Sequence, residues 1–214
     1  MKKNVKVLLT VLYVSSLLIA NIIAAKQVQL PFGVTMTGAI IIFPITYILS
    51  DVFSEVYGYA WSRKTCFYAF TMNLLASIMF LIAIKIPYPT YWQNQEAFEI
   101  VLGNAPRMLL ASFSGFMLGD YINDIVFKKM KEKHKSEIKG FGWRAIISSI
   151  CGEAADSAIF VPLAFLGQMP LKDMAIMGVS QVALKVAYEV IILPVTTRIC
   201  KILRKIETTD KNGK

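Results

Sequence analysis

Long apolar segments alternate with clusters of charged residues along the whole chain. Each apolar segment holds roughly 20 residues, the length that an α-helix needs to cross a hydrocarbon core of about 30 Å. We therefore expect an all-α membrane protein, with a single bundle of six transmembrane helices in one integral membrane domain over residues 1–214. The expected spans cover about residues 7–25, 35–57, 66–86, 106–127, 143–166 and 174–199.

The first segment has an alternative interpretation as a secretory signal peptide, because Met1-Lys2-Lys3 precedes its apolar run. That run is longer than the hydrophobic region of a usual signal peptide, and five further spans follow it. We therefore expect a retained helix. A soluble helical core is the other alternative, but such a core would not need so many long apolar segments.

Composition supports the membrane interpretation. Hydrophobic residues make up 56% of the chain and charged residues 17%, whereas a soluble domain usually carries about 25% charged residues. The three cysteines are far apart and the single histidine, His134, lies in a lysine-rich stretch. With so few soft ligands, we expect neither a metal site nor a cofactor.

Basic residues predict the orientation, because cytoplasmic loops of membrane proteins carry an excess of lysine and arginine. With the N-terminus in the cytoplasm, 18 of the 23 basic residues fall on the cytoplasmic side, and both termini are expected there. The lysine-rich segment 128–139 is then a cytoplasmic loop that anionic lipid headgroups attract. Although the net charge is +9, no aromatic residues are interleaved with the lysines of this segment, so we expect lipid and not nucleic acid as the partner. Four basic residues lie on the outer side: Lys26, Lys85, Arg107 and Lys172.

Acidic residues inside the expected spans are the first candidates for function. An ionised side chain near the middle of a bilayer costs roughly 2.5–3.5 kcal/mol on insertion scales, so such residues indicate an internal polar cavity. The alternative is a set of buried ion pairs that only hold helices together. The acids within or at the ends of the spans are Asp51, Glu55, Asp120, Asp124, Glu153, Asp156 and Glu189.

Two of these acids are expected to meet a lysine near the middle of the membrane. Glu153 and Asp156 are three residues apart and share a helix face, and Lys185 lies at a similar depth in the last span. Lys185 could also pair with Glu189, four residues further on. With one cation for two or three acids, one carboxylate is left either protonated or able to accept N–H donors from a ligand.

The second span places Tyr47, Asp51 and Glu55 on one helix face after Pro44, which is expected to kink the helix. Tyr47 is a candidate for stacking on a planar ligand, with packing in the core or against lipid as the alternative. Glu55 has two open interpretations, as a site residue or as an interfacial residue that pairs with Arg63.

Three further polar residues are candidates with open alternatives. Asn21 in the first span could join helices by hydrogen bonds or contact a ligand. Arg107 could donate to a ligand or extend to the membrane interface. Asp120 lies towards the inner end of the fourth span.

Motifs of catalysis are missing from the sequence. It has no H-E-x-x-H, no G-x-S-x-G and no phosphate-binding G-x-x-x-x-G-K-[ST], so we expect no enzymatic activity. An ion channel would need rings of like residues. The mixture of acids, bases, hydroxyls and aromatics instead favours a neutral, planar solute rich in hydrogen-bonding groups.

Several motifs resemble those of the queuosine precursor transporter family, which was earlier described as a vitamin uptake family. The resemblance covers about residues 21–194, and its most specific block is "FPITYILSDVFSEVYGYAWSRK". It implies six transmembrane helices in a bacterial cytoplasmic membrane, and import of a 7-deazaguanine base such as 7-cyano- or 7-aminomethyl-7-deazaguanine for tRNA modification. The other motifs are "NIIAAKQV", "PRMLLASFSGFMLGDYINDIVF", "GEAADSAIFVPLAF" and "KVAYEVIILPV".

The resemblance also implies a substrate-binding role for particular residues. Some relatives have Asn where this chain has Glu153 and lack an acid at Asp120, so Asp51, Asp156 and Lys185 are the central candidates. The positions that match the polar positions of the family are Asn21, Asp51, Glu55, Arg107, Asp120, Glu153, Asp156 and Lys185.

Two functions follow as hypotheses. The first is a transporter that works by alternating access, with either proton coupling or facilitated diffusion. The second is a substrate-capture subunit of a multi-component uptake system, which would dock an energising partner through small-residue helix faces such as those near Gly38 and Gly115. The sequence leaves open whether the chain forms a homo-oligomer.

Overall fold

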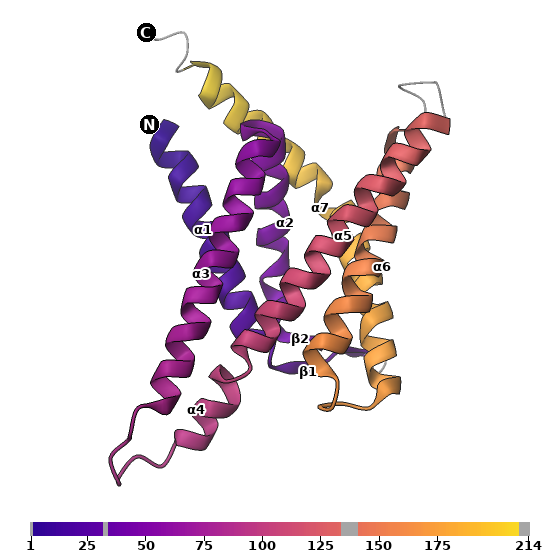
Figure 1. The fold of residues 1–214 in the computed structure, drawn as a ribbon. Helices are drawn as coiled ribbons and strands as arrows, with labels where there is room; N and C mark the ends of the chain where they lie inside the picture. Colours follow the sequence, from indigo (N-terminus) through magenta and orange to yellow (C-terminus); the bar gives the residue numbers. More distant parts are fainter. Residues whose placement is uncertain (1, 32–33, 134–140, 210–214) are drawn as a thin grey trace. The chain divides into compact units, whose positions relative to one another are not determined.

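The computed structural model describes residues 2–31, 34–133 and 141–209, and these are almost entirely helical (Figure 1). Four helices among them are long and apolar enough to cross a membrane: Val5–Ile23, Tyr59–Lys85, Ile146–Phe165 and Leu171–Lys205. An all-α membrane protein is therefore confirmed. The helices are α1 (Lys2–Ile23), the 3-10 helix η2 (Gly38–Ile41), α2 (Phe43–Val52), the π-helix η3 (Phe53–Tyr57), α3 (Tyr59–Lys85), α4 (Gln95–Leu102), α5 (Ala105–Lys133), α6 (Phe141–Phe165) and α7 (Leu171–Thr209).

The expected span 35–57 is wrong as a single α-helix. Its first residues form the strand β2 (Thr35–Thr37), which pairs with β1 (Gln27–Gln29). Gly38 then donates a hydrogen bond to the Lys26 carbonyl, and a side chain there would lie 2.6 Å from the Ile23 carbonyl oxygen. Pro44 does not kink a long helix but stands in the first turn of α2, where its missing N–H has no cost.

Helices occupy the other expected positions with shifted ends, although α5 is not among the four helices apolar enough to cross a membrane. Helix α3 begins at Tyr59 instead of near residue 66, and α7 continues to Thr209 instead of ending near residue 199. Helix α5 continues to Lys133 beyond its expected end near residue 127, so the first part of the lysine-rich segment is helical. Residues 134–140, including His134, lie outside the described residues. The connection between α3 and α5 contains the short helix α4, which the sequence did not predict.

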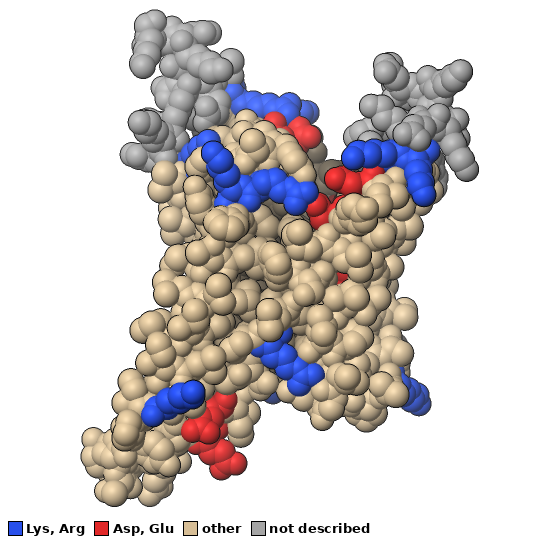
Figure 2. All heavy atoms as spheres, viewed as in Figure 1, with Lys and Arg blue, Asp and Glu red and all other residues tan. Residues whose placement is uncertain are grey.

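Helix α3 has small and polar residues inside and large apolar residues outside. Its buried positions are Thr65, Ala69, Asn73 and Ser77, four residues apart. Its exposed positions include Phe67, Leu74, Leu75, Ile78 and Ile82, and Figure 2 shows an uncharged surface over this helix between charged groups towards its ends. Small interior residues let helices approach closely, and lipid covers the apolar exterior.

Contacts between residues divide the chain into two units. Unit 1 consists of Met1–Lys26, Thr37–Pro106 and Glu189–Lys214, and unit 2 of Gln27–Met36 and Arg107–Tyr188. Helix α7 therefore contributes its first part to unit 2 and the rest to unit 1. Within unit 1, α1 packs against α3 and α2, around a core that includes Tyr13, Leu49, Phe53 and Ala69.

Candidate functional site

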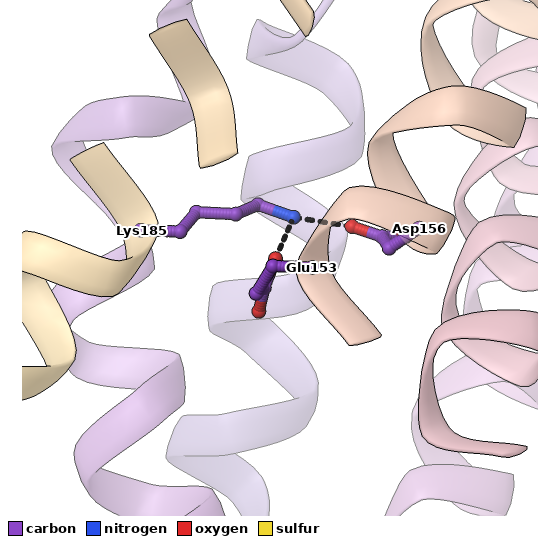
Figure 3. Close-up of polar contacts among 3 residues, drawn as sticks. All are labelled: Glu153, Asp156 and Lys185. Carbon is purple, nitrogen blue, oxygen red and sulfur yellow. Dashed lines mark hydrogen bonds and ion pairs between the residues drawn. The ribbon is translucent and has the colours of Figure 1, made fainter. Parts of the chain in front are cut away.

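Three charged side chains meet between α6 and α7 in unit 2 (Figure 3). The Lys185 ammonium lies 2.8 Å from Glu153 Oε2 and also donates a hydrogen bond to Asp156 Oδ2. Their side chains are largely buried, with exposed fractions of 10% for Lys185, 20% for Glu153 and 19% for Asp156. The predicted meeting of these residues is confirmed, and we call them the triad.

The sequence brings the triad together through simple helix geometry. Glu153 and Asp156 lie three residues apart on α6, so both side chains project from one face. A short connection joins α6 to α7, and Figure 1 shows the first part of α7 running back beside α6 in the opposite direction. Lys185 thereby faces the two carboxylates, and its flexible stem carries the charge into the space between them.

Two glycines on α5 pack closely against Asp156. A side chain at Gly115 would collide with the Asp156 carboxylate and would lie 2.9 Å from the Asp156 backbone oxygen. A side chain at Gly119 would lie 2.8 Å from the Gly152 oxygen and 3.0 Å from the Asp156 Cβ. This G-x-x-x-G spacing lets two helix backbones approach closely, so α5 packs directly against the part of α6 that carries the site.

The charge balance of the triad suits a ligand with N–H donors. One ammonium faces two carboxylates, so the fully ionised group carries one excess negative charge. Carboxylate oxygens accept hydrogen bonds, and an ammonium only donates them. The triad can therefore offer both acceptors and a donor to one guest. No group of three metal-binding side chains occurs among the described residues.

A second group of charges lies in unit 1. Glu55 Oε2 is 2.6 Å from Arg204 Nη2, and Arg204 also donates to the Glu55 backbone oxygen at 2.9 Å. Asp51 lies in α2, four residues before Glu55 in the adjoining π-helix η3. Tyr47, one turn before Asp51, lies with its ring 6.3 Å from that of Phe43. The sequence analysis missed Arg204 as a partner of Glu55, since the two residues are 149 positions apart and no local spacing could reveal the pair.

Asn21 acts as a link between helices in unit 1. Its amide donates to Asn73 Oδ1 at 2.8 Å, and Asn73 in turn donates to the Ala69 backbone oxygen. Both asparagines are buried. This arrangement supports the first of the two interpretations of Asn21. Asn73 was missed, although a lone amide in an apolar span is itself a signal of such a contact.

Arg107 binds the end of α6 in unit 2. Its guanidinium donates to the Leu163 carbonyl at 2.7 Å and to the Leu166 carbonyl at 2.6 Å. Carbonyls in the last turn of a helix lack intrahelical donors, and a cation there also interacts favourably with the helix dipole. These contacts give Arg107 a structural role in joining α5 to α6. Asp120, the residue after Gly119, is partly buried on α5.

Comparisons with known proteins agree with the motifs of the sequence. A family model described as "Putative vitamin uptake transporter" matches residues 37–199. The chain is 26% identical over 175 residues to a "Probable queuosine precursor transporter" of Bacillus subtilis (strain 168), covering 82% of this chain and 76% of that protein. It is 24% identical over 162 residues to a protein of the same description from Haemophilus influenzae, covering 67% of this chain and 65% of that protein. No solved structure matches.

Proposed function

The chain belongs to the family described as "Putative vitamin uptake transporter", and we propose that it imports a queuosine precursor, a 7-deazaguanine base such as 7-cyano-7-deazaguanine, across the cytoplasmic membrane. The matched relatives are each described as a "Probable queuosine precursor transporter". The observation that carries the proposal is the buried triad of Glu153, Asp156 and Lys185. A buried group with excess negative charge is expensive in lipid, and a ligand with N–H donors would compensate it.

The chemistry of a guanine-like base fits the triad. Such a base presents a ring N–H and an exocyclic NH₂ as adjacent donors, and one carboxylate can accept both. Its carbonyl oxygen needs an N–H or O–H donor close to the carboxylates. The incoming N–H groups compete with Lys185 for the carboxylate oxygens, so binding loosens the contact between α6 and α7 that the ammonium maintains. This competition links occupancy of the site to helix movement, as alternating access requires.

The proposed topology has six crossings in one membrane domain, with both termini in the cytoplasm. Four crossings are the long apolar helices. The fifth is α5, which is long enough but contains Asp120 and Asp124. The sixth is the helical stretch from η2 through α2 to η3. Accessibility labelling of single cysteines placed at Lys64, Tyr91 and Lys201 tests this topology, and labelling of Lys64 or Lys201 positions from the outside would contradict it.

Uptake of labelled 7-cyano-7-deazaguanine by cells that cannot make it tests the function. We expect uptake to depend on the chain and to be lost in Asp156→Asn and Lys185→Met variants, since each removes one side of the proposed site. Lys172→Met, at an exposed position of α7, is the matched control and should transport normally. Normal uptake in both site variants would show that the triad is not the binding site.

Reconstitution of the purified chain alone in liposomes distinguishes a transporter from a substrate-capture subunit. We expect the chain to carry the base without a partner protein or ATP. An imposed proton gradient should accelerate uptake if a carboxylate of the triad carries a proton, and should have no effect on facilitated diffusion. Gly38 and Gly115, considered as docking positions for a partner, both lie against other parts of the chain itself, so neither supports the capture-subunit hypothesis.

A further inference from the structure

Two buried polar side chains in unit 2 each carry an atom that has no hydrogen-bond partner within the described part of the chain. Gln181 on α7 is 1% exposed and Ser157 on α6 is 3% exposed. The unpaired atoms are Gln181 Nε2 and Ser157 Oγ. A buried amide or hydroxyl without a hydrogen bond costs roughly 1–3 kcal/mol in proteins, so these two groups point to a polar guest.

The register of the two helices places Gln181 and Ser157 next to the triad. Lys185 contacts Glu153, which fixes how α6 and α7 are aligned. Gln181 lies four residues before Lys185, and Ser157 four residues after Glu153. Because the helices run in opposite directions, both steps lead one turn towards the connection between them. Gln181 and Ser157 therefore occupy one layer, directly adjacent to the charged layer.

The next layer in the same register is apolar. Met177 lies four residues before Gln181, and Val161 lies four residues after Ser157, and both are buried. The polar layer is thus bounded by charges on one side and by hydrophobic side chains on the other. Ligand sites commonly combine a few placed polar groups with an apolar wall.

We propose that Gln181 and Ser157 bind the carbonyl-bearing edge of the transported base while the carboxylates of the triad hold its N–H donors. This proposal rests on the proposed function. Gln181 carries an NH₂ donor and Ser157 a hydroxyl donor, which suit a carbonyl oxygen. The two layers are one helical turn apart, about 5.4 Å, so one small planar molecule can contact both. Gln181 then determines specificity for bases that carry a carbonyl group.

Binding measurements on the purified full chain test the proposal, with 7-cyano-7-deazaguanine as the probe. Gln181→Met keeps the side-chain volume and removes the amide, and Ser157→Ala removes the hydroxyl. We expect each variant to bind the probe about tenfold more weakly, which corresponds to about 1.4 kcal/mol. The melting temperature without ligand should not fall, since an unpaired buried group is lost. Ser148→Ala, at a buried serine of the same helix, is the control and should bind normally.

An analogue of the probe in which sulfur replaces the carbonyl oxygen separates recognition from a general effect on the pocket, because it keeps the N–H donors and weakens only the acceptor. The unmodified protein should bind this analogue about tenfold more weakly than the probe, and Gln181→Met should show a smaller difference between the two compounds, because only the Ser157 hydroxyl still donates to the carbonyl. If the ratio of the two affinities in Gln181→Met is the same as in the unmodified protein, Gln181 does not bind the carbonyl and the inference is wrong.

The remaining outcomes are also informative. A lower melting temperature with unchanged affinity in Gln181→Met and Ser157→Ala would assign the pair a structural role and overturn the inference, while the proposed function would stand. If the unmodified protein binds neither 7-cyano-7-deazaguanine nor 7-aminomethyl-7-deazaguanine, the proposed function fails and the inference fails with it.

Discussion

The triad and the pair of Arg204 and Glu55 are both built from basic and acidic side chains, but they differ strongly in burial. In unit 2, the side chains of Lys185, Glu153 and Asp156 are at most 20% exposed. In unit 1, Arg204 and Glu55 are 57% and 64% exposed. Both groups pair a cation with an acid at short distance. The exposed pair is solvated whether or not it forms, whereas the buried triad depends on its internal balance of charge.

This difference has an energetic consequence. An exposed ion pair typically contributes about 0.2–1 kcal/mol, because water and salt weaken the attraction. Removing one member of a buried pair costs roughly 3–5 kcal/mol, since the remaining charge is left without compensation. A protein that keeps two carboxylates and one ammonium away from water therefore accepts a large cost there, which is easier to understand if the group binds a ligand.

Loss of the Lys185 charge should have the largest effect. Lys185→Met leaves two neighbouring carboxylates buried without a cation, so we expect the free energy of unfolding to fall by roughly 3–5 kcal/mol and uptake to be abolished. Denaturant unfolding in detergent micelles measures the first effect, and uptake of the labelled base measures the second. If Lys185→Met leaves the free energy of unfolding unchanged, the buried triad does not contribute more to stability than the exposed pair.

A triple variant that removes all three charges of the triad distinguishes an effect on stability from an effect on uptake. The combination of Lys185→Met with Glu153→Gln and Asp156→Asn removes the uncompensated charge, and such replacements are often neutral for stability. We expect the stability of this variant to recover relative to Lys185→Met, while uptake stays absent. Restored uptake would mean that the charges serve only to hold α6 against α7.

The sequence was sufficient to predict the triad but not the exposed pair. Glu153, Asp156 and Lys185 lie on two helices joined by a short connection, so helix periodicity and depth were enough to bring them together. Glu55 and Arg204 are 149 residues apart, and depth alone does not choose among the basic residues near one membrane surface. The prediction of the second span as a single α-helix was wrong for another reason. Apolar composition predicts burial in lipid, whereas the strand at Thr35–Thr37 depends on pairing with Gln27–Gln29.

A glycine-to-alanine change on α5 should disturb the triad through packing alone. In Gly115→Ala, the new methyl group meets the Asp156 carboxylate and the Cβ of Phe160 at 3.3 Å. Overpacking of this kind typically costs 1–3 kcal/mol, and the displaced carboxylate should weaken uptake. Gly178→Ala on α7 is the control, because nothing lies within 4 Å of its added methyl group. That variant should be as stable as the unmodified protein or gain up to about 1 kcal/mol.

The asparagine pair of unit 1 should have an intermediate effect on stability and none on uptake. Asn21→Ala removes the donor to Asn73, and hydrogen bonds between membrane helices average about 0.6 kcal/mol with a maximum near 1.7. If Asn21 acts only through Asn73, Asn21→Ala should cause no further loss of stability in an Asn73→Ala background, whereas Asn73→Ala alone should cost more than Asn21→Ala because it also loses the bond to the Ala69 carbonyl. A loss of probe affinity in Asn21→Ala but not in Asn73→Ala would instead make Asn21 a ligand contact.

Neutralising the exposed pair should have the smallest effect. In Glu55→Gln, the hydrogen bond from Arg204 to the Glu55 backbone oxygen can persist, so only the attraction between the charges is lost. We expect the free energy of unfolding to change by about 0.2–1 kcal/mol, and the difference to shrink as salt is raised from 0.05 to 0.5 M, which shortens the screening length (roughly 8 Å at 0.15 M). Uptake at saturating substrate should stay close to normal. Abolished uptake with unchanged stability would place Glu55 in the transport cycle, and exposure would then no longer separate the functional charged group from the structural one.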